Sequence, residues 1–98
     1  MTELERIALA MDVTPDALSG RCRTSKIIIR KRIAAWYLHE VKGYTYQEIG
    51  RMLNKDHTTI LDHKHNHSAA VRTWREYAEV FQRFMKTMSN NIQKEALR

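Results

Sequence analysis

The chain has 98 residues with a net charge of +6, and 43% of its residues are hydrophobic and 29% charged. Such a chain holds one small folded domain, expected over residues 1–98, with no room for an ATPase or another large catalytic domain. No apolar run approaches the roughly 20 residues that cross a bilayer, the mixed start MTELERIALAM is not typical of a secretory signal, and the single cysteine excludes an internal disulfide. These features predict a cytoplasmic protein with a polyanionic partner, nucleic acid first and a membrane surface second.

The amino-terminal residues predict two short helices. Thr2 and Glu5 have the spacing of a capping box, which starts a helix that continues to about Met11. Thr14–Pro15 places an N-cap before a proline at the first helical position, and so predicts a helical turn that ends at Leu18. Strand-like alternation is scarce along the chain, so we expect an all-α fold, a small helical bundle.

A basic arm, defined as residues 21–25, leads into a long predicted helix over about residues 26–42. The arm and the first turns of this helix carry basic side chains and no acid: Arg21, Arg23, Lys26, Arg30, Lys31 and Arg32. The positive charges of such a cluster repel one another unless an anion binds there, so the cluster indicates an anionic partner. The alternative interpretation is a solvated basic face. Residues 27–29 are all isoleucine and favour a strand locally, but a helical apolar period continues past them: Ile29, Ile33, Trp36, Tyr37 and Val41. Gly43 stands where a helix end favours positive φ.

Two short helices joined by a tight connection come next. Thr45 and Glu48 form a second capping box, which starts a helix over about residues 46–53. Asn54–Lys55 is the connection, and another helix follows it at once. These proportions predict a helix-turn-helix over about residues 46–71.

The second helix of this pair begins with a polar tetrad, Asp56-His57-Thr58-Thr59. Asp56 is a good N-cap for a helix that runs from His57 to about Val71. In a helix-turn-helix this end enters the major groove, where an acid accepts from cytosine N4 and a threonine offers its hydroxyl or its methyl. An N-cap followed by β-branched surface residues explains the same pattern, and spacing alone leaves both interpretations open.

A last helix is predicted over about residues 74–88, started by a third capping box from Thr73 and Glu76. The polar SNNIQKEALR after it, residues 89–98, is expected to fray. The helix carries more aromatic residues than a small bundle must bury: Trp74, Tyr77, Phe81 and Phe84. They indicate either ordinary core packing or an edge that binds a partner or a second copy of the chain.

Three segments together resemble the C-terminal DNA-binding domain of the bacterial replication initiator family DnaA. YQEIGRMLNKDHTTILDH resembles the family's L-P-x-I-G-x-x-F-G-G-R-D-H-T-T-V-x-H, RKRIAAWYLHEV resembles P-R-Q-I-A-M-Y-L-x-x-E, and MDVTPDALSGRCR resembles its upstream segment. The resemblance covers about residues 4–71. It implies an all-helical bundle of the Trp-repressor-like group, as a stand-alone domain.

The resemblance also implies which residues meet DNA. Base edges in the major groove would be read by Asp56, His57 and Thr58, with Thr59 beside them. The phosphate backbone and the adjacent minor groove would be met by basic residues: Arg21, Arg23, Lys26, Arg30, Lys31 and Lys55. Lys64, a cation of the same helix as the tetrad, is expected to add a backbone contact. Ile29 stands where some members place a minor-groove arginine, and Arg30, in place of the family's proline, is expected to compensate. The histidines on or near the reading helix predict tighter binding as the pH falls from about 8 to about 6: His57, His63, His65 and His67.

Other site classes are less well supported. His63 and His67 have the i, i+4 spacing that zinc uses, but a closed site needs two more ligands, and His67 falls on the inward face of its helix, where a packed core residue is expected. Asp56 and His57 are neighbours that point about 100° apart on an exposed helix end, which does not suit catalysis. There is no Gly-rich phosphate loop. We therefore expect no enzyme activity, metal, cofactor or bound nucleotide, and no origin unwinding by the family mechanism.

The sequence thus predicts a sequence-specific double-stranded DNA-binding domain in the cytoplasm, associated with the nucleoid. Replication initiation, its regulation, transcription, and a phage or mobile-element role all fit this prediction. We expect a monomer or weak homodimer without a membrane partner. The alternative is a protein-interaction or self-associating module that uses the aromatic carboxy-terminal helix, with DNA binding secondary or non-specific.

Overall fold

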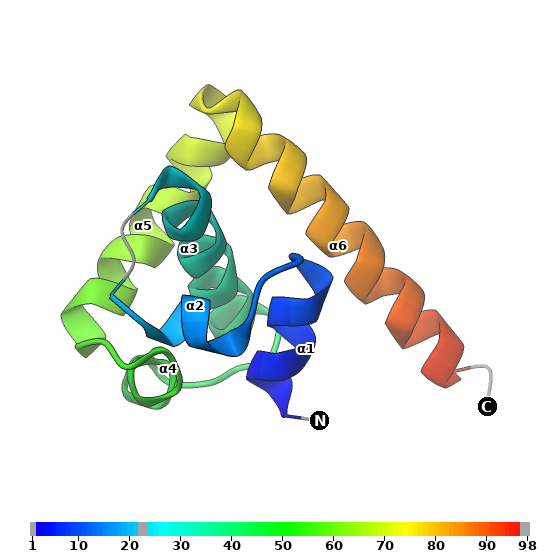
Figure 1. Ribbon diagram of the computed structural model, residues 1–98, viewed down its shortest axis with the longest axis horizontal. Helices are drawn as coiled ribbons and strands as arrows, with labels where there is room; N and C mark the ends of the chain where they lie inside the picture. Colours follow the sequence, from blue (N-terminus) through cyan, green and yellow to red (C-terminus); the bar gives the residue numbers. More distant parts are fainter. Residues whose placement is uncertain (1, 22–23, 97–98) are drawn as a thin grey trace.

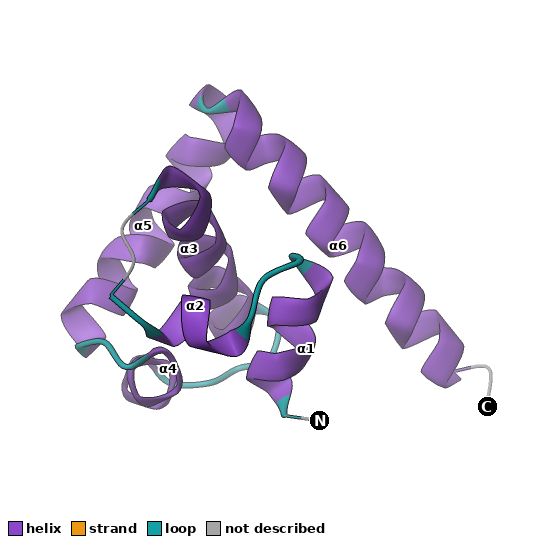
Figure 2. Ribbon diagram, viewed as in Figure 1, coloured by secondary structure: helices purple, strands orange, loops and turns teal. Residues whose placement is uncertain are grey.

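The computed structural model describes residues 2–21 and 24–96, with side chains as far as Ser89. Within these residues the structure consists of helices without strands (Figures 1 and 2), which confirms the predicted all-α class. The elements are α1 (Glu3–Ala10), α2 (Pro15–Ser19), α3 (Ser25–Glu40), α4 (Tyr46–Leu53), α5 (His57–Thr73) and α6 (Arg75–Ala96). No helix in the described part of the chain is both long and apolar enough to cross a membrane.

The helix starts follow the predicted caps. Thr2, Thr14 and Thr45 each accept the backbone N–H of the residue three positions later, at 3.1, 3.2 and 3.1 Å. The first and third of these complete a capping box with a glutamate. Local hydrogen bonding therefore fixes where α1, α2 and α4 begin.

The long helix α3 is the centre of the bundle. It packs against α2, α4, α5 and α6, and Figure 1 shows α6 running diagonally past the other helices. Ile29, Ile33 and Tyr37 of the predicted apolar face are buried. The prediction for Val41 is wrong, since its side chain is 46% exposed. α3 ends at Glu40, so Val41 is the C-cap and lies past the turn that packs against the core.

The junction between α5 and α6 differs from the prediction. The third capping box is absent, because α5 continues through Thr73, whose hydroxyl donates to the carbonyl of Ala69 at 2.7 Å. Trp74 then has extended backbone angles and makes the corner before α6. At its other end α6 continues to Ala96, beyond the predicted end near residue 88.

His67 lies at the centre of an aromatic cluster between α3, α5 and α6. It is 4% exposed, its ring stacks on Trp36 with centroids 4.8 Å apart, and Phe81 meets it edge-on at 4.7 Å. Its Nδ1 lies 2.6 Å from the hydroxyl of Tyr77, and Phe84 is fully buried. The prediction that His67 is a packed core residue is confirmed, and the aromatic side chains of α6 contact the core of their own chain.

Candidate nucleic-acid interface

Gly50 sets how closely α4 and the start of α5 approach. A Cβ added to Gly50 would lie 2.6 Å from the carbonyl oxygen of Lys55, and the N–H of Lys55 donates to the carbonyl of Gly50 at 2.8 Å. Asn54 makes the turn with a φ of 55°, as expected for an asparagine in place of the family's glycine. Gly50 was not among the predicted site residues, although a glycine inside an amphipathic helix usually has a packing reason.

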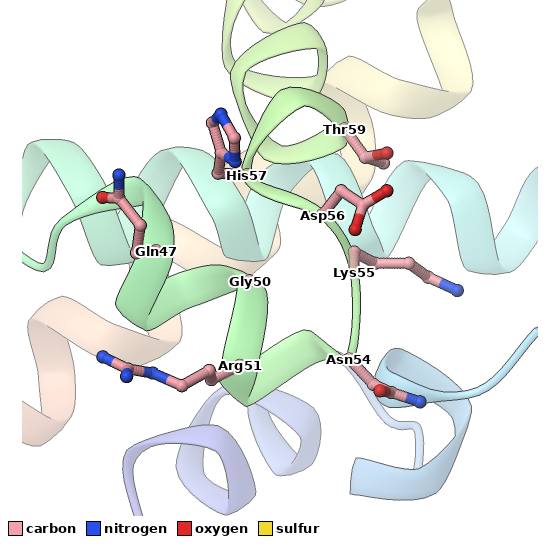
Figure 3. A pocket seen from close by; sticks show the side chains of 8 residues that line it. All are labelled: Gln47, Gly50, Arg51, Asn54, Lys55, Asp56, His57 and Thr59. Carbon is pink, nitrogen blue, oxygen red and sulfur yellow. The ribbon is translucent and has the colours of Figure 1, made fainter.

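The outer side of this turn is an open hollow of about 550 Å³. Figure 3 shows side chains of α4, the turn and the start of α5 around it. Its lining residues are Gln47, Gly50, Arg51, Asn54, Lys55, Asp56, His57 and Thr59. Gln47 and Arg51 were not among the predicted site residues. Both stand on the outward side of a helix whose inward side is apolar, which is the signal that could have found them.

The polar tetrad lies at the amino-terminal end of α5. Asp56, His57 and Thr58 are exposed and Thr59 is half-buried, while the next residue, Ile60, is fully buried and anchors the helix. Asp56 occupies the N-cap position, but its side chain makes no capping hydrogen bond. The expectation that this carboxylate caps α5 is therefore wrong. The exposed end of α5 also presents backbone N–H groups and the positive pole of the helix dipole.

The predicted backbone contacts separate into two groups. Arg21 and Lys26 are exposed, as such a contact requires, and Arg23 lies outside the described residues. Arg30 is half-buried instead, because its Nε donates to the carbonyl of Met11 at 3.0 Å and a terminal nitrogen donates to the carbonyl of Lys26 at 2.8 Å. Its guanidinium therefore ties α3 to the end of α1.

Two further lysines have partners in their own chain. Lys31 is 4% exposed, so the prediction that it meets the DNA backbone is wrong. Lys64 lies 2.8 Å from a carboxylate oxygen of Glu40 and 6.0 Å from the ring centre of Tyr46. This ion pair raises the pKa of Lys64, and the lysine joins α5 to α3 and α4.

Lys55, expected to contact a phosphate, and Ile29, at the position of a minor-groove arginine in some family members, both have partners within the protein. The ammonium of Lys55 donates to the carbonyl of Gly20 at 3.0 Å, so it is partly engaged. Ile29 is fully buried in the core, so a side chain at this place in the fold points away from solvent. That Arg30 compensates for it stays a prediction, made for a guanidinium that already donates to the carbonyls of Met11 and Lys26.

Two of the four histidines of α5 are withdrawn from solvent. Burial first, and then the charges of Arg32 and Lys31, lower the pKa of His63 to about 4. Burial alone lowers the pKa of His67 to about 4. With pKa values of about 4, neither ring is expected to gain a proton between pH 8 and 6 in the free protein, so neither supports the expected tightening of binding over that range. In the part of the chain that the structure describes, no three His, Cys, Asp or Glu side chains gather as a metal site would need.

Comparison with known proteins identifies the arrangement of α4, turn and α5. A family model described as the bacterial dnaA protein helix-turn-helix matches residues 4–66. The chain belongs to this family. The DnaA helix-turn-helix is a DNA-binding motif, so membership supports binding to DNA.

Two relatives of the DnaA family show how much of a full initiator the chain represents. The chain is 23% identical over 61 residues to the chromosomal replication initiator protein DnaA of Deinococcus deserti. It is 26% identical over 58 residues to the protein of the same name from Deinococcus radiodurans. The matches cover 62% and 59% of this chain but only 13% and 12% of the relatives. The chain therefore corresponds to a small part of each DnaA.

Proposed function

We propose that this chain binds double-stranded DNA sequence-specifically, with the amino-terminal end of α5 in the major groove. The observation that carries the proposal is the exposed DHTT segment at the start of α5, in a chain of the DnaA helix-turn-helix family. Asp56, His57 and Thr58 read base edges, and Thr59 lies beside them. The fully buried Ile60 holds this end of α5 in place, and a rigid support suits the reading of bases.

Each side chain of the reading tip, which we define as Asp56, His57 and Thr58, has a distinct partner on the bases. The carboxylate of Asp56 makes no capping hydrogen bond, so it is available to accept from cytosine N4. Thr58 offers a hydroxyl for hydrogen bonds and a methyl for contact with the methyl of thymine. His57 hydrogen-bonds to a base or packs against a thymine methyl.

Phosphate contacts are assigned to the exposed cations around the reading tip. Arg21 and Lys26 are exposed on the arm and on the first turn of α3, and Arg51 lines the hollow beside α5. In a helix-turn-helix the first helix crosses the DNA backbone, which gives Arg51 and Gln47 a phosphate partner. Lys55 has one donor on Gly20 and two remaining N–H groups for a phosphate.

The biological role we propose is replication initiation or its regulation. The relatives are named as chromosomal replication initiator proteins, and this chain matches the helix-turn-helix part of that family. A domain that binds initiator sites can recruit an initiator activity to them or compete for them. A cytoplasmic, nucleoid-associated location follows from this role, with transcription as another process that the same binding would serve.

Selection of binding sites from a pool of random duplexes tests the proposal. We expect enrichment of a motif that the chain then binds at least about a thousandfold more tightly than a scrambled duplex. Equal affinity for both duplexes would contradict sequence-specific reading. Gel filtration at two concentrations tests the alternative of self-association through α6, which predicts earlier elution at the higher concentration.

A further inference from the structure

The carbonyl oxygen of Gly20 accepts two charged hydrogen bonds from distant parts of the chain. The Nζ of Lys31 in α3 donates to it at 2.7 Å, and the Nζ of Lys55, between α4 and α5, donates to it at 3.0 Å. We call these three groups the Gly20 bridge. A carbonyl has two lone pairs and the bridge uses both. Bonds from a charged donor are stronger than those between neutral groups, so the bridge is a strong restraint on Gly20.

Gly20 stands at the point where the chain leaves α2 for the basic arm. It is the C-cap of α2 and directly precedes Arg21, which is exposed. A Cβ on Gly20 would lie 2.8 Å from the carbonyl oxygen of Asp16, so only a glycine fits here without a shift of the backbone. The bridge therefore restrains the start of the arm relative to α3 and to the turn that precedes the reading tip.

The two lysines of the bridge differ in exposure. Lys31 is buried, so it is too deep to contact DNA itself. Lys55 is half-buried and lies in the turn next to Asp56. The half-buried His63 of α5 and Arg32 of α3 lie near these two lysines. The pKa of His63 is lowered to about 4, so at neutral pH its imidazole is uncharged and adds no repulsion beside the two ammonium groups.

We propose that Lys55 is a positioning residue for Arg21, the first residue of the basic arm. Through the carbonyl of Gly20 it holds Arg21 in a fixed place relative to the reading tip, so that the major-groove contact of α5 and the backbone contact of Arg21 are set together. Lys31 supports the same carbonyl from the side of the core. The bridge is present in the protein without DNA, and only its effect on DNA affinity rests on the proposed function.

Cleavage after Arg21 by an arginine-specific protease measures the bridge in the DNA-free protein. We expect Lys55→Met to speed cleavage at this bond by about tenfold, because loss of a charged hydrogen bond raises the population of the locally opened segment. Lys55→Arg should restore slow cleavage, since a guanidinium can also donate to the carbonyl. Lys31→Met should act in the same direction as Lys55→Met.

Lys86→Met is the matched control, because it removes an exposed cation from α6 and should leave cleavage after Arg21 unchanged. Mass spectrometry identifies the bond that is cut. An unchanged rate at this bond in Lys55→Met would overturn the proposal. Faster cleavage at all arginines together, with a lower Tm, would also overturn it, because it would show general loosening rather than release of the arm.

A double-mutant cycle on the selected DNA site then tests the effect on binding. If Lys55 acts through the arm, Lys55→Met and Arg21→Gln together should lose about three- to tenfold less affinity than the product of their separate effects. Multiplying effects would mean that the two residues act separately and would overturn the positioning role in DNA binding. If the unchanged chain binds no duplex, the proposed function fails, while the cleavage rates still decide whether the bridge holds the arm.

Discussion

On the proposed function, single residues differ in what they contribute to DNA binding. Base contacts carry sequence information and phosphate contacts do not. Thr58 is exposed and takes no part in the helix caps, so its substitution tests reading with little risk to the fold. Lys26 is an exposed cation in the first turn of α3, which makes it the matched residue for a backbone contact.

Thr58→Ala should cost about 1–3 kcal/mol of binding free energy on the selected site and little on a scrambled duplex. Lys26→Ala should weaken binding to both duplexes alike and lower the salt slope by about one. Titrations of both variants on both duplexes, with Tm checked first, give the comparison. An equal loss on both duplexes for Thr58→Ala would mean that the tetrad holds phosphate and does not read bases.

The buried histidine of the core predicts how stability depends on pH. The pKa of His67 is about 4 in the folded chain against an ordinary value of 6.5, so the unfolded chain binds the proton more readily. The free energy of unfolding should then fall as the pH drops below about 6.5, by about 1.4 kcal/mol per pH unit for one proton, and the loss should level off below about 4. Above pH 6.5 this residue adds no pH dependence.

Urea unfolding at several pH values checks this prediction against a double variant. His67→Leu with Tyr77→Phe removes the titrating ring together with the hydroxyl that lies 2.6 Å from it, so no buried polar group loses its partner. The double variant should show a shallower pH dependence between 6.5 and 4. If the free energy of unfolding changes equally with pH in the double variant and in the unchanged chain, the proton is taken up by another residue.

At the scale of elements, the contact between α4 and α5 decides whether the reading tip is presented. At Gly50 the contact is between backbone and backbone. A Cβ added to Gly50 would collide with the carbonyl oxygen of Lys55. Alanine usually stabilises a helix relative to glycine by up to about 1 kcal/mol. Here the clash outweighs that gain, because a backbone carbonyl cannot rotate away as a flexible side chain can.

Gly50→Ala should therefore lower the free energy of unfolding by about 1–3 kcal/mol, the range for overpacking. It should also weaken DNA binding, because α5 is displaced from α4. Asn66→Ala, at an exposed position of α5, is the control and should be neutral or slightly stabilising. If Gly50→Ala melts at a higher temperature than the unchanged chain, the close contact does not constrain the motif.

At the scale of the whole molecule, fewer positive side chains are available for phosphate contacts than the net charge of +6 suggests. Arg30, Lys31 and Lys64 are committed to internal partners. Among the described residues, the cations to which we assign phosphate contacts are Arg21, Lys26, Arg51 and Lys55. The sequence alone, which counted the whole basic cluster, predicts a steeper dependence of affinity on salt, with a log–log slope of about −4 to −7.

With these internal partners, the slope should be about −3 to −5, since each phosphate contact contributes about −0.9. Fluorescence titrations of the selected duplex over a range of salt concentrations measure it. The control is Lys64→Met, which should leave the slope unchanged because this lysine is paired with Glu40. A slope near zero would contradict DNA binding, and a smaller slope for Lys64→Met would place Lys64 on the phosphate backbone.

The sequence by itself determined the helices and the motif. Capping residues such as Thr2 and Thr45 act on backbone groups three residues away, and the apolar period of α3 is set by helix geometry, so both can be recognised without a structure. The segment DHTT and its neighbours likewise indicate the DnaA helix-turn-helix family from the sequence alone. All of these signals arise between residues that are close together in the sequence.

Only the tertiary structure decided which polar groups are free. Lys31 and Lys55 meet on Gly20, 11 and 35 positions away from it, and Lys64 pairs with Glu40 of another helix. Thr73 has the spacing of a helix cap but donates backward within α5, because the packing of α5 extends that helix to the corner at Trp74. Long-range packing sets the burial and the partners of a charge, and residue spacing in the sequence carries no measure of either.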